Sequence, residues 1–274
     1  MERKPQRRRG QSFKQDYNSG SQPSLFEKMK ARVTGQRLRQ PSMIHEAGRD
    51  LIQPKEPAME GRMTIVLDLD ETLIYAREGP LYARPGVDEL LQYLKEHFEA
   101  VVWTAGVRAY AQAVVKNIDK GGAIQHCVYR HRKWFSGQAG YNKDLRLLGR
   151  DMNNTIIIEN TPDCLRGNEG NGILVADYEG GELADDTLYC ILALLKDMVA
   201  RRKTNATLSA VEYVATSRFL TRQAVPTDLG DPLNCFCLDA SNPELFKALK
   251  EQRINKDLPV SHQQPAGAAK PTKK

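Results

Sequence analysis

The fold is decided by residues 63–73, which read Met-Thr-Ile-Val-Leu-Asp-Leu-Asp-Glu-Thr-Leu. The apolar run from Thr64 to Leu67 is rich in β-branched side chains, which is typical of a strand buried on both faces. Asp68 and Asp70 follow where this run ends. Because side chains alternate along an extended chain, both carboxylates can face one space beyond the strand, where open α/β sheets bind their ligands. A strand followed by a plain acidic turn would give the same D-x-D pattern.

Strands and helices alternate after this stretch, which predicts a parallel sheet with helices on both faces. A turn signal at 78–80 separates two short segments that can pair as a small hairpin, 74–77 and 81–83. Further buried strands are predicted at 99–104, 124–129, 155–159 and 172–176, and helices at 87–97, 107–118 and 183–202. Beyond residue 204 the pattern predicts only helices, at 208–220 and 242–254.

The charge distribution divides the chain into a cationic arm and a nearly neutral domain. Residues 1–62 contain 14 Lys/Arg against 7 Asp/Glu, whereas the whole chain carries a net charge of +6. We predict a basic, largely disordered arm at 1–60, an α/β domain at 61–204, a helical extension at 205–256 and a disordered tail at 257–274. The arm fits a contact with RNA or another polyanion, a targeting signal, or a solvated tail.

The composition points to an intracellular protein. No apolar run reaches the roughly 18 residues that cross a membrane. The five cysteines form no C-x-x-C pair, and an odd number without signal-peptide features is typical of reduced thiols. The five histidines show no metal-ligand spacing. The basic arm is compatible with either the nucleus or the mitochondrion.

Polar side chains at the ends of the predicted strands can form a site for phosphoryl transfer. Asp68 can attack as a nucleophile and form an aspartyl-phosphate, which divides hydrolysis into two steps. Asp70 can protonate the leaving oxygen and then deprotonate the attacking water. Thr104 can hydrogen-bond a phosphoryl oxygen, and Lys143 can neutralise the charge that Asp68 shares with the phosphate. Alone, Thr104 would be an ordinary strand-end threonine and Lys143 a surface lysine.

A second group of oxygen ligands predicts a magnesium site beside these residues. Glu159 and Asn160 stand at the end of the predicted strand at 155–159. Together with the Asp68 carboxylate and the main-chain carbonyl of Asp70, they can complete the oxygen shell that Mg²⁺ prefers.

Six segments of the chain, in the same order, resemble the phosphatase family that acts on the C-terminal domain of RNA polymerase II, a branch of the haloacid dehalogenase superfamily. They are residues 66–73, 83–91, 103–105, 141–145, 148–152 and 156–162. The resemblance implies a Rossmann-like haloacid dehalogenase fold and a Mg²⁺-dependent phosphatase that acts on phosphoserine or phosphothreonine in proteins. It assigns the nucleophile to Asp68, acid/base work to Asp70, and phosphate contacts to Thr72, Thr104 and Lys143. It assigns metal binding to Asp68, Asp70, Asn160 and Glu159, the last through a water.

Two departures from the family pattern leave the function open. Glu159 stands where the family usually has Asp, and Mg²⁺ tolerates little misplacement of its ligands. Residues 74–84 have room only for a minimal hairpin in place of a cap, a short form similar to the mitochondrial inner-membrane translocase receptor, which uses this domain chiefly for binding. An active protein phosphatase is the first hypothesis. The alternatives are a catalytically weak binding or assembly module for RNA or protein, and a small-molecule phosphatase.

Overall fold

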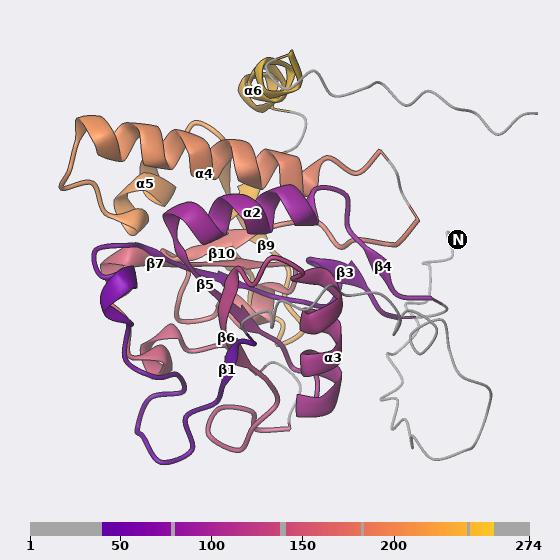
Figure 1. Ribbon diagram of the computed structural model, residues 1–274. Helices are drawn as coiled ribbons and strands as arrows, with labels where there is room; N and C mark the ends of the chain where they lie inside the picture. The colour runs from indigo at the N-terminus through magenta and orange to yellow at the C-terminus, as the bar shows by residue number, and fades with distance from the viewer. Residues whose placement is uncertain (1–39, 78–79, 138–140, 182–183, 240–241, 255–274) are drawn as a thin grey trace, which may run out of the picture. The chain divides into compact units, whose positions relative to one another are not determined.

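A computed structural model describes residues 40–77, 80–137, 141–181, 184–239 and 242–254 of the chain (Figure 1). In this part of the chain the centre is a sheet with the strand order β1-β6-β5-β2-β7-β8-β10-β9. All neighbouring strands are parallel except β10 and β9. The strands are β1 (Ser42–Met43), β2 (Thr64–Leu67), β5 (Glu99–Trp103), β6 (Ile124–Val128), β7 (Thr155–Glu159), β8 (Gly172–Leu174), β9 (Leu220–Val225) and β10 (Leu233–Leu238).

Helices pack on this sheet, except that the last one, residues 243–254, packs on the helix at 187–204. They are α2 (Val87–His97), α3 (Arg108–Ile118), α4 (Thr187–Thr204), α5 (Ala210–Thr216) and α6 (Pro243–Ile254), with short 3-10 helices η1 (Pro57–Met59), η2 (Leu145–Leu148), η3 (Met152–Asn154) and η4 (Pro162–Leu165). Helix α2 buries Val87, Leu90, Leu91 and Leu94, the stripe expected of an amphipathic helix. Helices α2 and α4 lie side by side (Figure 1).

The predicted α/β fold is confirmed, including the hairpin that replaces a cap. Strands β3 (Ile74–Tyr75) and β4 (Tyr82–Ala83) pair antiparallel, with Ile74 opposite Ala83. The central strands are buried on both faces, which explains their continuous apolar sequences. No helix in the described ranges is long and apolar enough to cross a membrane.

The prediction that the disordered arm extends to residue 60 is wrong. Ser42 and Met43 form β1, which pairs in parallel with β6 at the sheet edge. Leu51 and Ile52 are each only 1% exposed and belong to the core. The prediction rested on the net charge of the first 60 residues and did not take this short apolar pair into account. Residues 1–39 lie outside the described ranges, so the disorder of the arm and its contact with a polyanion stay predictions, as does the tail at 257–274.

The prediction of a purely helical extension at 205–256 is also wrong. Helices α5 and α6 are present, but β10 and β9 lie between them and extend the central sheet. Phe236 of β10 pairs with Ile173 of β8 and with Arg222 of β9. Strand β10 covers an edge of β8 whose backbone groups would otherwise be open to pairing with another chain. The extension is therefore part of the sheet.

Candidate active site

The candidate site lies beyond the end of β2, where the order of strands changes direction. The chain passes from β2 to β5 and β6 on one side, and to β7 and β8 on the other. Leu67 is in register with Val102 of β5 and with Ile158 of β7, so the ends of these three strands meet. Ligands of open α/β sheets bind at such a switch point.

The predicted residues surround one cavity of about 300 Å³ at this point. Five of the seven line it: Asp68, Asp70, Lys143, Glu159 and Asn160. Thr72 and Thr104 are fully buried beside it and do not line it. The remaining lining residues, which the sequence did not single out, are Glu71, Arg77, Ala105, Tyr141, Thr161, Pro162, Cys164 and Asp177.

Lys143 joins the two carboxylates that end β2 and β7. Its Nζ lies 2.5 Å from Asp68 Oδ1 and 2.7 Å from Glu159 Oε2, and it donates a third hydrogen bond of 2.8 Å to the carbonyl of Trp103. All three side chains of this ion-paired group are almost fully buried. One ammonium thus faces two carboxylates, which leaves the ionised group with a net negative charge beside the cavity.

This imbalance shifts the ionisation of both partners. Burial, followed by the charge of Glu159, raises the pKa of Asp68 to about 7, although Lys143 acts in the opposite direction. Burial alone would lower the pKa of Lys143. The charges of Asp68 and Glu159 outweigh it and raise that pKa well above its usual range. A cation bound beside Asp68 would favour the carboxylate form that a nucleophile needs.

Asp70 is held by two hydroxyl groups. Thr104 Oγ1 donates to Asp70 Oδ2 at 2.7 Å, and the Tyr110 hydroxyl donates to Asp70 Oδ1. The N–H of Gly106 donates in turn to Thr104 Oγ1 at 2.9 Å. The hydroxyl of Thr104, predicted to contact the phosphate, is therefore engaged with Asp70. Tyr110 was not predicted as a site residue from the sequence, where its only signal is its position in the first turn of the helix after this strand.

Thr72 and Asn160 form a second hydrogen-bonded pair beside the cavity. Thr72 Oγ1 donates to Asn160 Oδ1 at 3.1 Å, so the hydroxyl predicted to bind phosphate is directed to the amide. Asn160 Nδ2 donates to Asp177 Oδ1 at 2.9 Å, and Arg77 forms an ion pair of 2.5 Å with the other carboxylate oxygen. Asp177 lies after β8 in a segment without regular structure, where no sequence pattern marked it.

The extra methylene of Glu159 lets its carboxylate form hydrogen bonds with two parts of the site at once. Its Oε1 accepts the N–H groups of Asn160 and Thr161, at 3.1 and 3.0 Å, while Oε2 accepts the hydrogen bond from Lys143. The Glu159 side chain thus connects the buried ammonium of Lys143 to the turn that carries Asn160. Both of its oxygens are bonded within the protein.

A buried arginine fixes the loop that carries Asp70. Glu71 has a positive φ of 58°, an uncommon conformation for a residue with a side chain. Arg84 is 1% exposed and donates to the carbonyls of Thr72 at 3.2 Å and Ala176 at 3.0 Å. It also makes a two-pronged ion pair with Asp185. Arg84 therefore ties the loop after β2 to the loop after β8.

The donor set fits a magnesium ion. Asp68, Asp70, Asn160 and Asp177 bring carboxylate and amide oxygens to one cavity, which are the hard ligands that Mg²⁺ takes. The net negative charge of the ion-paired group favours a cation there. Among the described residues there is no cluster of three or more His, Cys, Asp or Glu side chains poised to bind a metal. The expected ligands include an amide and a main-chain carbonyl, so such a cluster is not required.

Comparison with known proteins identifies the family of this chain. The chain belongs to the NLI interacting factor-like phosphatase family, whose model matches residues 63–206. The strand order is that of an open, Rossmann-like α/β sheet, as the sequence resemblance implied.

Individual relatives are phosphatases by name. A probable C-terminal domain small phosphatase from Dictyostelium discoideum is 32% identical over 169 residues, covering 54% of this chain and 55% of the relative. The human carboxy-terminal domain RNA polymerase II polypeptide A small phosphatase 2 is 30% identical over 159 residues, covering 51% and 58%. The chain thus spans a little over half the length of these curated relatives.

Solved structures of an RNA polymerase II CTD phosphatase also match. Fission yeast Fcp1 bound to beryllium fluoride aligns with a TM-score of 0.37 and 25% identity, covering 46% of this chain and 44% of that chain. A second Fcp1 structure aligns with a TM-score of 0.38 and 23% identity, covering 72% and 64%. The fold assignment rests on the strand order and the family match, because TM-scores at this level add nothing to it.

Proposed function

We propose that this protein is a Mg²⁺-dependent protein serine/threonine phosphatase that uses Asp68 as its nucleophile. The observation that carries the proposal is the arrangement of the two aspartates. Asp68 and Asp70 line the same cavity, yet Asp68 is paired with a buried ammonium while Asp70 is held by two hydroxyl groups. Two carboxylates in different surroundings suit one nucleophile and one acid/base group.

The chemistry follows from these two roles. In the first step Asp68 attacks the phosphorus, the bond from phosphorus to the serine or threonine oxygen breaks, and Asp70 gives its proton to that oxygen. In the second step water attacks the aspartyl-phosphate, Asp70 takes a proton from the water, and phosphate leaves Asp68. Lys143 balances the charge of Asp68 as the phosphate dianion approaches. Thr104 and Tyr110 keep Asp70 directed at the reacting oxygen.

The magnesium ion would be held by Asp68, the main-chain carbonyl of Asp70 and Asn160. Glu159 or Asp177 would orient its water ligands, and the bonded oxygens of Glu159 favour Asp177 for this task. When bound, the ion supplies positive charge that stabilises the phosphoryl oxygens in the transition state.

A phosphorylated protein is the substrate class that the comparisons support. The relatives are named as phosphatases of the C-terminal domain of RNA polymerase II. In the described ranges only the minimal hairpin of β3 and β4 stands in the place of a cap, which leaves room for a phosphorylated side chain of a polypeptide. We extend the relatives' substrate class to phosphoserine and phosphothreonine, and not to a particular target.

One set of assays tests this function. Purified full-length protein is given p-nitrophenyl phosphate and a phosphoserine peptide, with Mg²⁺ or with EDTA. We expect turnover of both in Mg²⁺ and none in EDTA, and a loss of at least about a thousandfold in Asp68→Asn with the far-UV spectrum unchanged. Binding of beryllium fluoride, followed by fluorine NMR, should also need Asp68. A chain that folds and binds Mg²⁺ but hydrolyses neither substrate would be a binding module.

A further inference from the structure

We propose that a groove at the opposite end of the sheet from Asp68 binds an acidic peptide segment of a partner protein, anchored by one large apolar side chain. This basal groove is a cavity of about 410 Å³. It is lined by Gly61, Arg62, Met63, His97, Phe98, Met198, Val199, Arg202, Lys203 and Ala206. The inference goes beyond the proposed catalytic function and does not depend on it.

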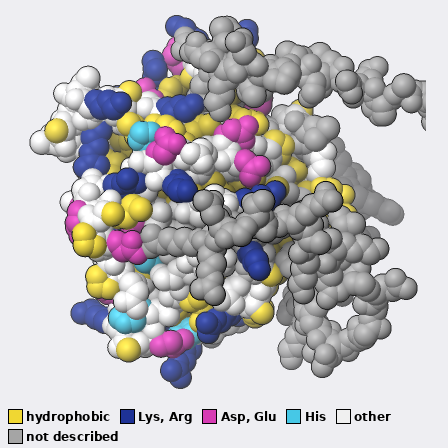
Figure 2. All heavy atoms as spheres, in the orientation of Figure 1, with side chains coloured by type: hydrophobic (Ala, Val, Ile, Leu, Met, Phe, Trp, Pro, Cys, Tyr) yellow, Lys and Arg dark blue, Asp and Glu magenta, His cyan; other side chains and the backbone are white. Residues whose placement is uncertain are grey.

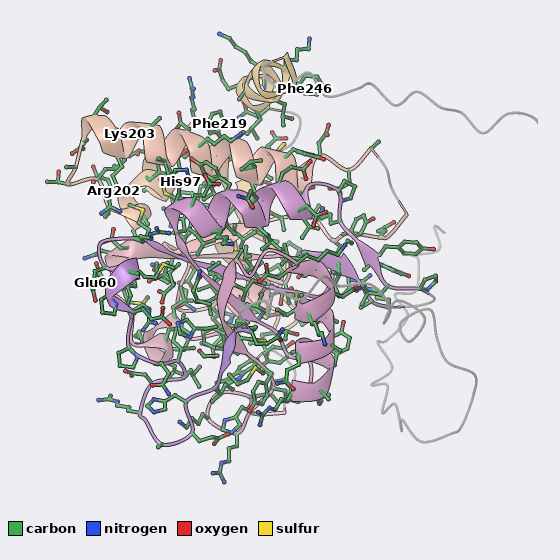
Figure 3. All side chains as sticks on the ribbon, viewed as in Figure 1. Glu60, His97, Arg202, Lys203, Phe219 and Phe246 are labelled. Atoms are coloured by element: carbon green, nitrogen blue, oxygen red, sulfur yellow. The ribbon has the colours of Figure 1, made fainter. Side chains whose placement is uncertain are left out.

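The strand directions place the basal groove. Met63 directly precedes β2 and Phe98 directly precedes β5, so both lie at the amino ends of parallel strands whose carboxyl ends form the catalytic cavity. Arg202 and Lys203 come from the last turn of α4, and His97 from the end of α2. Figure 3 shows these three side chains at the end of the molecule away from β3 and β4. A partner held there would leave the catalytic cavity open.

The floor of the basal groove is apolar. Met63 and Phe98 are each 2% exposed and Met198 is fully buried, and Val199 lies beside them. A cavity of this size, with such a floor, accommodates one large apolar side chain. Anchoring by one buried side chain is how peptide segments bind shallow grooves.

The rim of the basal groove is cationic. Arg62, Arg202 and Lys203 line it together with His97, and no acidic side chain is among the described residues that line it. Arg202 and Lys203 have no ion-pair partner in the described part of the chain. Figure 2 shows several Lys and Arg side chains on the face that it draws, with Asp and Glu side chains among them. The nearest acid to His97 is Glu96, at 4.0 Å, and it does not line the groove.

The positive charge of the rim favours an acidic segment of another protein over the two terminal segments of this chain. The two terminal segments outside the described ranges are themselves cationic, with 11 Lys/Arg against 3 Asp/Glu in residues 1–39 and 4 against 1 in residues 255–274. A cationic rim repels both of them. An acidic segment from another protein complements the rim, and one apolar residue within it fills the floor.

The probe is a short fluorescein-labelled peptide in which Asp and Glu flank a single Trp, without phosphate. A companion peptide carries Ser in place of Trp. Anisotropy is measured with the full-length protein at physiological salt, because the basic arm contributes non-specific attraction that salt screens. We expect saturable binding of the Trp peptide and at least about tenfold weaker binding of the Ser peptide.

Two sets of variants locate the binding site. The double variant Arg202→Glu/Lys203→Glu reverses the rim, and Ala206→Trp fills the groove without changing the charge. Both should weaken binding by at least about tenfold. The matched control, Lys116→Glu/Lys120→Glu, makes the same change of net charge on exposed positions at the end of α3 and beyond it, and should change binding by less than about twofold. Thermal melting checks that each variant folds.

Several results would overturn the proposal. They are an absence of saturable binding, binding that survives in both groove variants, or an equal loss in the control variant. Binding to phosphatidylserine vesicles instead of the peptide would make the groove a membrane contact. A dimer that the rim variant dissociates, seen by light scattering, would make it a contact between copies. Hydrolysis of p-nitrophenyl phosphate, measured in parallel, should not change in the groove variants, so the two functions are tested separately.

Discussion

The hydroxyl of Tyr110 donates a hydrogen bond to one carboxylate oxygen of Asp70, while Thr104 donates to the other. Tyr110 lies in the first turn of α3 and Thr104 directly follows β5, so a helix and a strand together orient the carboxylate. Burial, followed by the charge of Asp70, raises the pKa of the Tyr110 hydroxyl far above its usual range. Tyr110 therefore remains a hydrogen-bond donor at every working pH.

We expect Tyr110→Phe to impair the proton transfer that Asp70 performs. A phosphoserine has a poor leaving group that needs a proton, whereas p-nitrophenolate leaves without one. Turnover of a phosphoserine peptide should therefore fall by about tenfold or more, and turnover of p-nitrophenyl phosphate by much less. The control is Tyr213→Phe, because the Tyr213 hydroxyl is also buried but bonds Leu194 and Asp197 away from the cavity. Equal losses on both substrates would contradict the positioning role.

The pKa of Asp68 predicts how stability depends on pH in the absence of metal. Its value of about 7 in the folded protein lies above the ordinary value of 3.8, so the folded state holds this proton more tightly. The resulting stabilisation is fully present below about pH 4 and is lost as the pH rises to about 7. Asp68→Asn removes this dependence. In EDTA the variant should therefore gain stability relative to the wild type as the pH rises, by roughly 1–3 kcal/mol at pH 8.

Thermal melting between pH 4 and 8 measures this difference. Addition of Mg²⁺ at pH 8 should raise the melting temperature of the wild type and have little effect on Asp68→Asn, because the ion binds the folded state only. A difference in stability that does not change with pH would show that Asp68 is ionised throughout the range.

We expect Glu159→Asp to destabilise the protein. The shorter side chain cannot reach Lys143 and the N–H groups of Asn160 and Thr161 at once, so a buried hydrogen-bonding group loses its partner. The cost should be about 1–3 kcal/mol in the free energy of unfolding, measured with urea. The exposed Glu60→Asp is the matched control. Unchanged stability of Glu159→Asp would mean that Lys143 moves to follow the shorter acid.

Two truncations test where the arm ends. Deletion of residues 1–39 should leave the free energy of unfolding unchanged. Deletion of residues 1–60 also removes β1 and the buried pair Leu51 and Ile52, and should cost about 3–6 kcal/mol from the lost apolar burial alone. Urea unfolding of the two fragments beside the full chain makes the comparison. Equal stabilities would place residues 40–60 outside the core.

The parts of the site that the sequence predicted share one physical cause. Glu159 ends a continuous apolar strand, Asp68 and Asn160 directly follow such strands, and the carboxyl ends of neighbouring parallel strands meet in space. A short motif and its distance from a strand were therefore enough to bring these residues together. The roles of Thr72 and Thr104 were harder to predict, because their hydroxyls have partners inside the protein whose direction no motif reports.

The elements that the sequence did not predict carry weak local signals. Strand β9 exposes Arg222 and Gln223 and lies at the sheet edge, so it lacks the apolar run that marked β2 and β7. Asp177 follows β8 without regular structure, and its place beside Asn160 depends on Arg84 tying two loops together. Such contacts arise only from the complete fold.

The pairing of β1 with β6 has a consequence for how the chain is made. Ser42 pairs with His126 at the edge of the sheet, so β1 is synthesised long before the strand with which it pairs. Such long-range parallel contacts form slowly. Until β6 is in place, Leu51 and Ile52 have no core to enter and remain exposed on the nascent chain. The segment at 40–60 therefore joins the core only after the chain has been made at least to β6.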